Sequence, residues 1–234
     1  MIPALFLAVA LIGYLLGSIP FGLLIARSFA RTDIREVGSG KIGMTNVLRT
    51  AGKKAAALAL ILDVAKGVMA VLIAEIIFAV ARLNAGETGP WLTGSAQAVA
   101  ALAAIAGHTW SVFLRFKGGR GVSTFIGGLL AMYWPAAIVG GGFMLFIGFR
   151  TRYMSLGSII GAVTAFIMLM AFNILQIDYL KPYPAIEYVT YAMIGAIFIY
   201  IMHRDNISRL YNGTERKIGD KARAGTSPSP SHTK

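Results

Sequence analysis

The N-terminal sequence MIPALFLAVALIGYLLGSIPFGLLIA, residues 1–26, contains no charged side chain. A helix of about 20 mainly apolar residues crosses the hydrocarbon core of a bilayer, so this stretch is long enough to span one. It also lacks the basic region that begins a secretory signal peptide. We therefore expect residues 1–26 to form a membrane-spanning helix that the protein retains.

The rest of the chain has the composition of an integral membrane protein. Of its 234 residues, 56% are hydrophobic and 14% are charged, and the mean hydropathy is +0.68. These values exclude an ordinary soluble domain of this size. Further apolar segments lie at about 54–82, 90–114, 153–176 and 185–202. The sequence therefore predicts an all-α integral membrane protein.

The apolar segment from Gly121 to Phe149 is longer than one crossing requires, because about 29 helical residues would extend about 43 Å. Trp134 and Pro135 lie near its middle. Proline lacks a backbone donor and disfavours helix at the residue before it. We expect two short central helices of about 14 residues each, with a re-entrant element as the alternative.

The charges are distributed unevenly over the predicted loops. The chain has 22 Lys and Arg against 10 Asp and Glu, a formal net charge of +12. In a seven-crossing arrangement only Arg82 and Lys181 fall on one side, and cytoplasmic loops are the ones enriched in Lys and Arg. We expect a seven-helix transmembrane bundle with the N-terminus outside and the C-terminus in the cytoplasm. This topology explains the positive charge without a nucleic-acid partner.

Three polar segments would then meet at the cytoplasmic face. They are Gly38–Arg49 (GSGKIGMTNVLR), Gly107–Gly121 (GHTWSVFLRFKGGRG) and His203–Glu215 (HRDNISRLYNGTE). The run Arg115–Gly121 combines three cations with three glycines, a composition that suits phosphate because glycine admits backbone N–H groups and the cations supply charge. A basic loop that only orients the helices is the alternative for this run. Together the three segments indicate a site for a phosphorylated substrate beside an apolar bundle.

These segments resemble the three motifs of the bacterial acyl-phosphate:glycerol-3-phosphate acyltransferases, the PlsY family. The similarity covers nearly the whole chain, including Leu62–Gly67 (LDVAKG) and Arg152–Leu156 (RYMSL). It implies an enzyme that transfers an acyl chain from acyl phosphate to the 1-hydroxyl of sn-glycerol 3-phosphate. The products are 1-acylglycerol 3-phosphate (lysophosphatidic acid) and phosphate, in the first acylation of phospholipid synthesis.

The resemblance also implies a multi-pass protein of the bacterial cytoplasmic (inner) membrane, in contact with membrane lipid, whose active site faces the cytoplasm. We expect residues 1–221 to form a single transmembrane acyltransferase domain that works as a monomer. Residues 222–234, rich in Ser, Thr and Pro, are expected to be a disordered cytoplasmic tail. No metal or other cofactor is expected, since no carboxylates or histidines recur at ligand spacing.

The site residues follow from the same resemblance. The catalytic residues are expected to be Ser39, Arg49, His203 and Asn206. The substrate phosphates are expected to be bound by Ser39, Thr45, Asn46, Arg49, Lys117, Gly118, Gly119, Gly121 and Ser155, with Arg49 and Lys117 as the main clamps.

The general base stays open, because none of the three histidines begins a His-x4-Asp motif. His203 and Asn206, three residues apart, share one helix face and can orient the acceptor hydroxyl or polarise the carbonyl. Acyl phosphate is already activated, so the protein needs mainly to position it. The hypothesis is that a substrate phosphate oxygen takes the hydroxyl proton.

Some positions differ from the usual family pattern or have an open role. Lys41 and Met44 stand where Asn and Ala are usual, and Arg120 replaces a common Lys, which keeps the charge but offers a bidentate fork. Asp63 and Lys66 lie within a predicted span, where a functional site and a structural ion pair are equal alternatives.

Glu215, His108 and a second function have alternative interpretations. Glu215 is expected to stabilise the fold among cations, and His108 either reacts or forms a hydrogen bond inside the bundle. The alternative function is a membrane transporter or binding protein for a phosphorylated solute. A transporter needs a polar path to the outer face, and the predicted outer loops, about 82–89 and 177–184, carry none of the phosphate-binding residues.

Overall fold

The computed structural model describes residues 1–85, 89–177 and 185–220, and contains helices and no strand within those ranges. The elements are α1 Ile2–Ser18, α2 Phe21–Ala30, α3 Met44–Ala85, α4 Pro90–Thr109, η1 Val112–Leu114, α5 Val122–Met132, α6 Trp134–Thr151, α7 Met154–Ile174, α8 Ile186–Met202 and α9 Arg204–Tyr211. The predicted all-α class is confirmed. The predicted tail, 222–234, and Lys181 lie outside the described residues.

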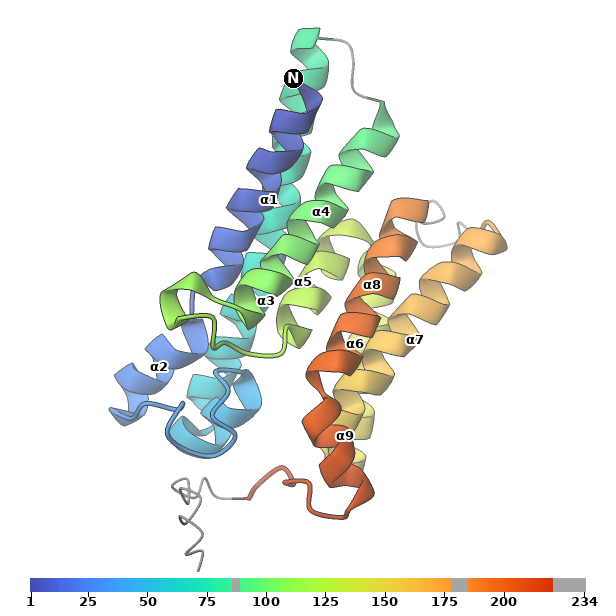
Figure 1. Ribbon diagram of the computed structural model, residues 1–234. Coiled ribbons are helices and arrows are strands. Elements are labelled where there is room, and N and C mark those ends of the chain that lie inside the picture. The colour runs from blue at the N-terminus through green and yellow to red at the C-terminus, as the bar shows by residue number, and fades with distance from the viewer. Residues whose placement is uncertain (86–88, 178–184, 221–234) are drawn as a thin grey trace, which may run out of the picture.

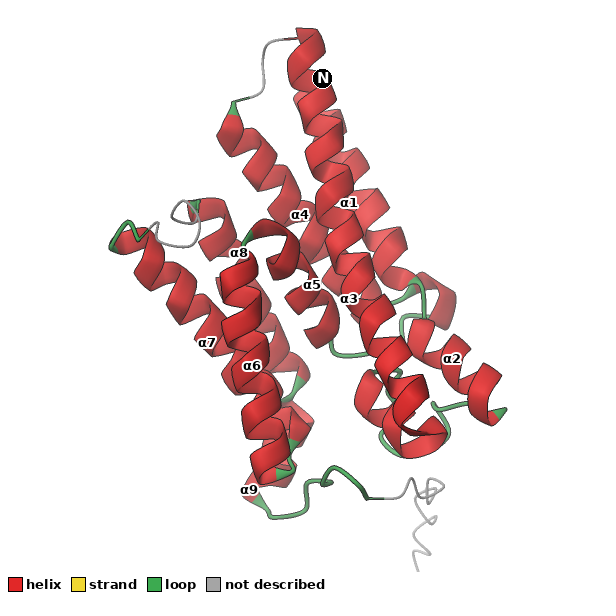
Figure 2. Cartoon of the chain, turned by 180° about the vertical axis from the view of Figure 1, so that it is seen from behind, coloured by secondary structure: helices red, strands yellow, loops and turns green. Residues whose placement is uncertain are grey.

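Within these ranges, five segments are long and apolar enough to cross a membrane, or six if α8 and α9, bent by 57°, count as one span. The helices fall into two groups (Figures 1 and 2). α1 packs against α3 and α4, while α7 packs between α6 and α8. The short helix α5 joins the groups, since it contacts α3, α4, α6 and α8.

The first apolar stretch is two helices rather than the single helix expected over residues 1–26. α1 ends at Ser18, Ile19 has φ −59° and ψ 119°, and α2 begins at Phe21. Pro20 causes the break, because it lacks a backbone donor and disfavours helical geometry at Ile19. The two helices still form one candidate span of 29 residues.

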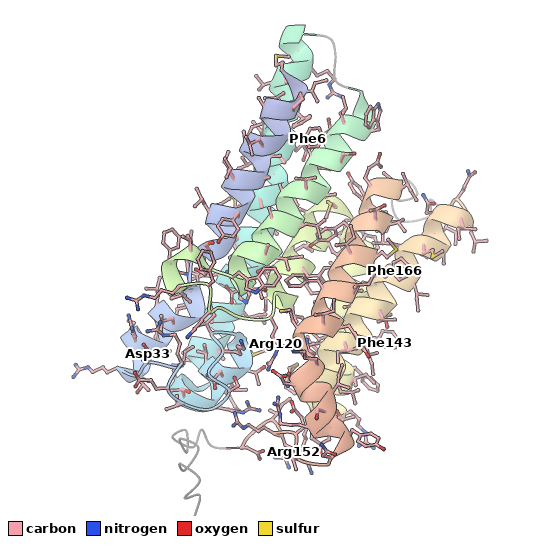
Figure 3. The ribbon with its side chains drawn as sticks, in the orientation of Figure 1. Phe6, Asp33, Arg120, Phe143, Arg152 and Phe166 are labelled. Atoms are coloured by element: carbon pink, nitrogen blue, oxygen red, sulfur yellow. The ribbon has the colours of Figure 1, made fainter. Side chains whose placement is uncertain are left out.

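The ambiguous central segment divides where the sequence predicted. α5 ends at Met132 and α6 begins at Trp134, followed by Pro135. α6 has 18 residues rather than about 14, whereas α5 has 11 and at 1.5 Å per residue extends only about half the hydrocarbon core. The pair returns the chain to the end it left, so Arg120 and Arg152 lie at the same end of the molecule (Figure 3).

Small residues bring the helices into close contact. On α1, a Cβ at Gly17 would collide with the backbone of Ala104 on α4. On α5, a Cβ at Gly127 would collide with the Val64 carbonyl on α3. Apolar side chains gain little by leaving lipid for another helix, so membrane helices depend on this close backbone approach.

Gly127→Ala is expected to lower the stability of the bundle by about 1–3 kcal/mol, because the added methyl group must push α5 away from α3. The measurement is the thermal midpoint of the purified protein in detergent. Gly141→Ala on α6 is the matched control, since a Cβ there has no heavy atom within 4 Å. Equal midpoints for the two variants would contradict the packing argument.

Candidate active site

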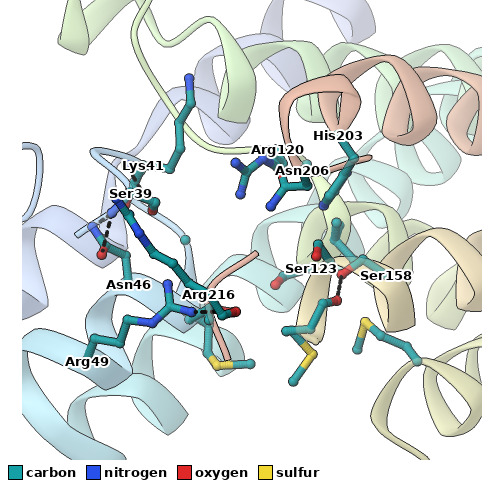
Figure 4. A pocket seen from close by; sticks show the side chains of 18 of the residues that line it. Ser39, Lys41, Asn46, Arg49, Arg120, Ser123, Ser158, His203, Asn206 and Arg216 are labelled. Atoms are coloured by element: carbon teal, nitrogen blue, oxygen red, sulfur yellow. Dashed lines mark hydrogen bonds between the residues drawn. The ribbon is translucent and has the colours of Figure 1, made fainter. Parts of the chain in front are cut away.

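α2, α9 and the loop between α2 and α3 lie at one end of the bundle (Figure 1). Residues from this end line a cavity (Figure 4). Eight of the predicted site residues line the cavity. They are Ser39, Thr45, Asn46, Arg49, Gly121, Ser155, His203 and Asn206. Segments far apart in the sequence thus meet in one cavity. The polar lining residues that the sequence did not assign to the site are Lys41, His108, Arg120, Ser123, Ser158, Arg209, Glu215 and Arg216.

Asn46 holds the loop that carries Ser39. Its buried side-chain Nδ2 donates to the carbonyls of Ile34 at 2.7 Å, Lys41 at 3.0 Å and Val37 at 3.2 Å. Its Oδ1 accepts the backbone N–H of Ser39 at 3.2 Å. The amide of Asn46 is therefore engaged within the protein, so its contribution is to fix the loop rather than to offer free donors.

Arg49 lies on the first turns of α3 and reaches the C-terminal segment. Its Nη2 is 3.4 Å from the carbonyl oxygen of Arg216 and 3.3 Å from that of Lys217, both long hydrogen bonds. Its buried Nε has no hydrogen-bond partner among the described residues. Because a buried guanidinium without full partners is costly, Arg49 can gain from an anion in the cavity.

The glycine-rich loop places different residues at the cavity than expected. Lys117 is exposed, and Lys117, Gly118 and Gly119 are not among the lining residues. The N–H groups of Gly118 and Gly119 donate to the carbonyls of Thr109 and His108 at 3.0 and 2.9 Å. These two amides were expected to donate to a phosphate. In the structure they donate to the carbonyls at the end of α4 instead.

Arg120, rather than Lys117, is the cation of this loop that lines the cavity. Its Nε donates to the carbonyl of Met202, the last residue of α8, at 3.3 Å. A cation there also complements the negative end of the helix dipole. The sequence predicted Lys117 as a phosphate clamp and marked Arg120 only as a replacement of a common Lys. Spacing alone does not show which cation of a tight loop points into the cavity.

His203 and Asn206 lie on one face at the junction of α8 and α9, as predicted, and both are buried. His203 Nδ1 lies 2.7 Å from the Ile199 carbonyl. A carbonyl only accepts, so Nδ1 carries the hydrogen and Nε2 of the neutral ring keeps a lone pair. Asn206 Oδ1 has no partner among the described residues, so it too can accept a hydrogen bond.

The Glu215 carboxylate accepts hydrogen bonds from three side chains at the cavity. Its carboxylate accepts from Asn206 Nδ2 at 2.6 Å, Ser155 Oγ at 2.8 Å and Arg209 Nε at 2.7 Å. Burial would raise its pKa, but the hydrogen bonds from Asn206, Ser155 and Arg209 outweigh this and lower the pKa. Glu215 is therefore a charged carboxylate that fixes the α9 end of the cavity, as its expected stabilising role requires.

Within the described residues, five cations line the cavity and Glu215 is the one carboxylate that does so. The cations are Lys41, Arg49, Arg120, Arg209 and Arg216. The pKa of Lys41 is lowered by burial and by the nearby charge of Arg120, partly offset by Asp205. Such a surplus of positive charge around one cavity favours bound anions. No three His, Asp or Glu side chains in the described ranges lie together as metal ligands would.

Arg209 and Arg216 could have been found from the sequence. Arg209 lies three residues after Asn206 and shares its helix face, and Arg216 directly follows the His203–Glu215 segment. Ser123 and Ser158 had no such signal. They enter the lining only because α5 and α7 begin beside the cavity.

This chain is similar to known glycerol-3-phosphate acyltransferases. The glycerol-3-phosphate acyltransferase family profile matches residues 7–213. Glycerol-3-phosphate acyltransferase 3 of Dehalococcoides mccartyi is 47% identical over 223 residues, 95% of this chain and 100% of that protein. Glycerol-3-phosphate acyltransferase of Caulobacter vibrioides is 42% identical over 226 residues, 95% of this chain and 92% of that protein.

Two crystal structures of PlsY, an integral membrane glycerol 3-phosphate acyltransferase, have the same fold. The glycerol 3-phosphate form has a TM-score of 0.74 and 35% identity, covering 92% of this chain and 96% of that one. The lysophosphatidic acid form has a TM-score of 0.73 and 34% identity, covering 92% and 95%. With the sequence match and the shared fold in agreement, the chain belongs to the glycerol-3-phosphate acyltransferase family and is an integral membrane acyltransferase.

Proposed function

We propose that this glycerol-3-phosphate acyltransferase takes its acyl chain from an acyl phosphate. The 1-hydroxyl oxygen of sn-glycerol 3-phosphate attacks the acyl carbonyl carbon, and the bond from that carbon to the phosphate oxygen breaks. The phosphate leaves with the bonding electrons, and 1-acylglycerol 3-phosphate is the second product. Membership of the acyltransferase family supports the acceptor, and the cavity chemistry supports the donor.

The mixed lining of the cavity is the observation that carries the proposal. Cations surround one part, while Leu60, Val122, Met144 and Met154 supply an apolar part. An acyl phosphate has the same two parts, an anionic head and an alkyl chain. Its phosphate would bind the cations while the first methylene groups contact the apolar side chains.

The cations would hold two phosphates close together, which would otherwise repel each other. We assign Arg49 and Arg120 as the clamps, because both line the cavity and Arg49 has an unpartnered Nε among the described residues. Ser39, Thr45 and Ser155 would add hydroxyl donors, and Gly121 allows close approach. Asn46 would act by fixing Ser39.

Lys117, Gly118 and Gly119 keep a supporting role in this proposal. They would not contact phosphate from their positions outside the lining. Instead the two glycines tie the loop to α4 through their amides and so hold Arg120. Lys117, which is exposed, would add long-range attraction for anionic substrates at the entrance.

His203 and Asn206 would orient the nucleophile. Either His203 Nε2 or Asn206 Oδ1 can accept the one hydrogen bond that the 1-hydroxyl donates, which turns an oxygen lone pair towards the acyl carbonyl. The hydroxyl proton then passes to an oxygen of the phosphate that leaves. The enzyme thus supplies geometry and positive charge, and the activated anhydride supplies the driving force.

We also propose the topology that the charge distribution favours. α5 and α6 would complete a seven-helix bundle with the N-terminus outside and the C-terminus in the cytoplasm of a bacterial inner membrane. The cavity would then face the cytoplasm, where the soluble substrate is available. Residues 1–221 would act as a single domain in a monomer, in contact with membrane lipid.

The decisive experiment gives the purified protein in lipid nanodiscs palmitoyl phosphate with and without glycerol 3-phosphate. Acceptor-dependent phosphate release and 1-palmitoylglycerol 3-phosphate, identified by mass spectrometry, are expected. Palmitoyl-CoA is the matched donor control and should yield no product. Product from palmitoyl-CoA alone would reject the acyl phosphate donor, and binding of both substrates without any product would favour a transporter or binding protein.

Arg49→Gln is expected to lower kcat/KM by about 100-fold or more, because the substrate phosphate loses a buried charge-assisted contact. Steady-state phosphate release measures this effect. Lys53→Gln, an exposed cation directly after the kink of α3 at Gly52, is the control and should retain nearly full activity. Equal activity of the two variants would remove Arg49 from the site.

His203→Ala is expected to lower kcat by about 100-fold, since the acceptor hydroxyl loses its orientation in the transition state. Arg204→Gln changes the exposed neighbouring residue and should leave kcat unchanged. An unaltered kcat with only a raised KM for glycerol 3-phosphate would contradict the orienting role of His203.

A further inference from the structure

A buried charge cluster lies directly behind the cavity. Asp63 and Lys66 are on α3, His108 is on the last turns of α4, and all three side chains are at most 3% exposed. Lys66 Nζ is 2.8 Å from Asp63 Oδ1, and His108 Nδ1 is 3.5 Å from the same oxygen. Burial of an ion pair is costly, so its presence beside the site requires an explanation.

The position of Lys66 has a structural reason of its own. Its Nζ donates to the Ile19 carbonyl at 3.2 Å, at the point where Pro20 breaks α1 from α2. Lys66 is the second donor to this carbonyl, which also accepts the N–H of Phe21 at 3.1 Å across the break. Asp63 then compensates the buried cation. Neither contact explains why Asp63 also faces His108.

His108 connects the charge cluster to the glycine-rich loop. Its carbonyl accepts the N–H of Gly119 at 2.9 Å. Its ring packs so closely on Gly119 that a Cβ there would collide with Nε2. His108 also lines the cavity. The orientation of this ring therefore sets where the backbone of Gly119 can lie.

Arg120 is the next residue, and it carries the effect to the reacting groups. Its guanidinium reaches the carbonyl of Met202, directly before His203. The route from Asp63 to the cavity is thus a series of packed or hydrogen-bonded contacts: the carboxylate, the imidazole ring, the loop backbone and the guanidinium. Each contact involves buried or half-buried groups with little freedom to rearrange.

We propose that Asp63 is a positioning residue for acyl transfer: its carboxylate, 3.5 Å from His108 Nδ1, attracts the N–H of the ring, orients the ring against Gly119, and thereby holds Arg120 in the cavity. Asp63 itself contacts neither substrate. The inference rests on the proposed function, since it assigns Arg120 to a substrate phosphate. It goes beyond charge compensation of Lys66, which needs no contact with His108.

Two double variants separate positioning from charge compensation. Lys66→Gln with Asp63→Asn removes both charges but keeps an oxygen that can accept from His108. Lys66→Gln with Asp63→Ala removes both charges and also the acceptor. Both variants carry the same Lys66→Gln change, so the loss of the buried cation and any change in its contact with the Ile19 carbonyl are matched between them.

The two double variants are expected to have similar thermal midpoints, and kcat/KM for glycerol 3-phosphate is expected to be about ten-fold lower in the one with alanine. Rescue by asparagine is the result that a purely structural ion pair would not produce. Equal kcat/KM in the two variants would overturn the positioning role. Glu75→Gln, an exposed carboxylate on the same helix, should leave kcat/KM unchanged.

A second test leaves Asp63 and Lys66 intact and applies even if the alanine variant fails to fold. His108→Gln and Arg120→Lys are measured singly and together. If His108 acts through Arg120, the combined loss in kcat/KM is several-fold smaller than the product of the single losses. Losses that multiply would overturn the route through Arg120. Wild-type protein is assayed alongside: failure of wild type to form product would reject the proposed function, whereas failure of these patterns alone rejects only the positioning role.

Discussion

The structure depends on one constraint of the bilayer: polar backbone groups that lack water must find partners within the protein. Hydrogen bonds within the helices satisfy most of these groups, but at the break before Pro20 the carbonyls of Ser18 and Ile19 accept from side chains of other helices or loops. Lys66 donates to Ile19 at 3.2 Å, and Ser111 Oγ donates to the Ser18 carbonyl at 2.6 Å. The same need explains the glycine-rich loop, whose amides bond to the end of α4. Irregular backbone is thus tolerated beside the cavity because neighbouring elements satisfy it.

This constraint also shapes the site. Because α4 takes the amides of Gly118 and Gly119, the proposed phosphate contacts are made by side chains, and the cation of this loop that lines the cavity is Arg120 rather than Lys117. A site built from guanidinium groups suits substrates whose phosphates must lie close together, since each fork can bridge two oxygens. Glu215 balances part of this charge and holds Asn206 and Arg209 in place.

The membrane location and the chemistry are linked by the two-part lining of the cavity. Its cations lie beside Leu60, Met144 and Met154, so a head group and an alkyl chain can bind in one place. The close glycine contacts between α3 and α5 keep the helices that carry both parts in register. With the proposed acyl phosphate donor, the enzyme would need rigid packing more than a strong base, because that donor is already activated.

The sequence by itself determined the helical class, the break before Pro135 and the meeting of three polar segments, because apolar length, proline and charge act locally along the chain. Through the family resemblance it also predicted His203, Asn206 and Arg49 as site residues, and all three line the cavity. Only the tertiary structure decided that residues 1–26 bend at Pro20, that Arg120 turns inward while Lys117 stays exposed, and that Asp63 faces His108. The reason is physical: these outcomes depend on which carbonyls and side chains of other helices lie nearby, and neither spacing nor composition contains that information.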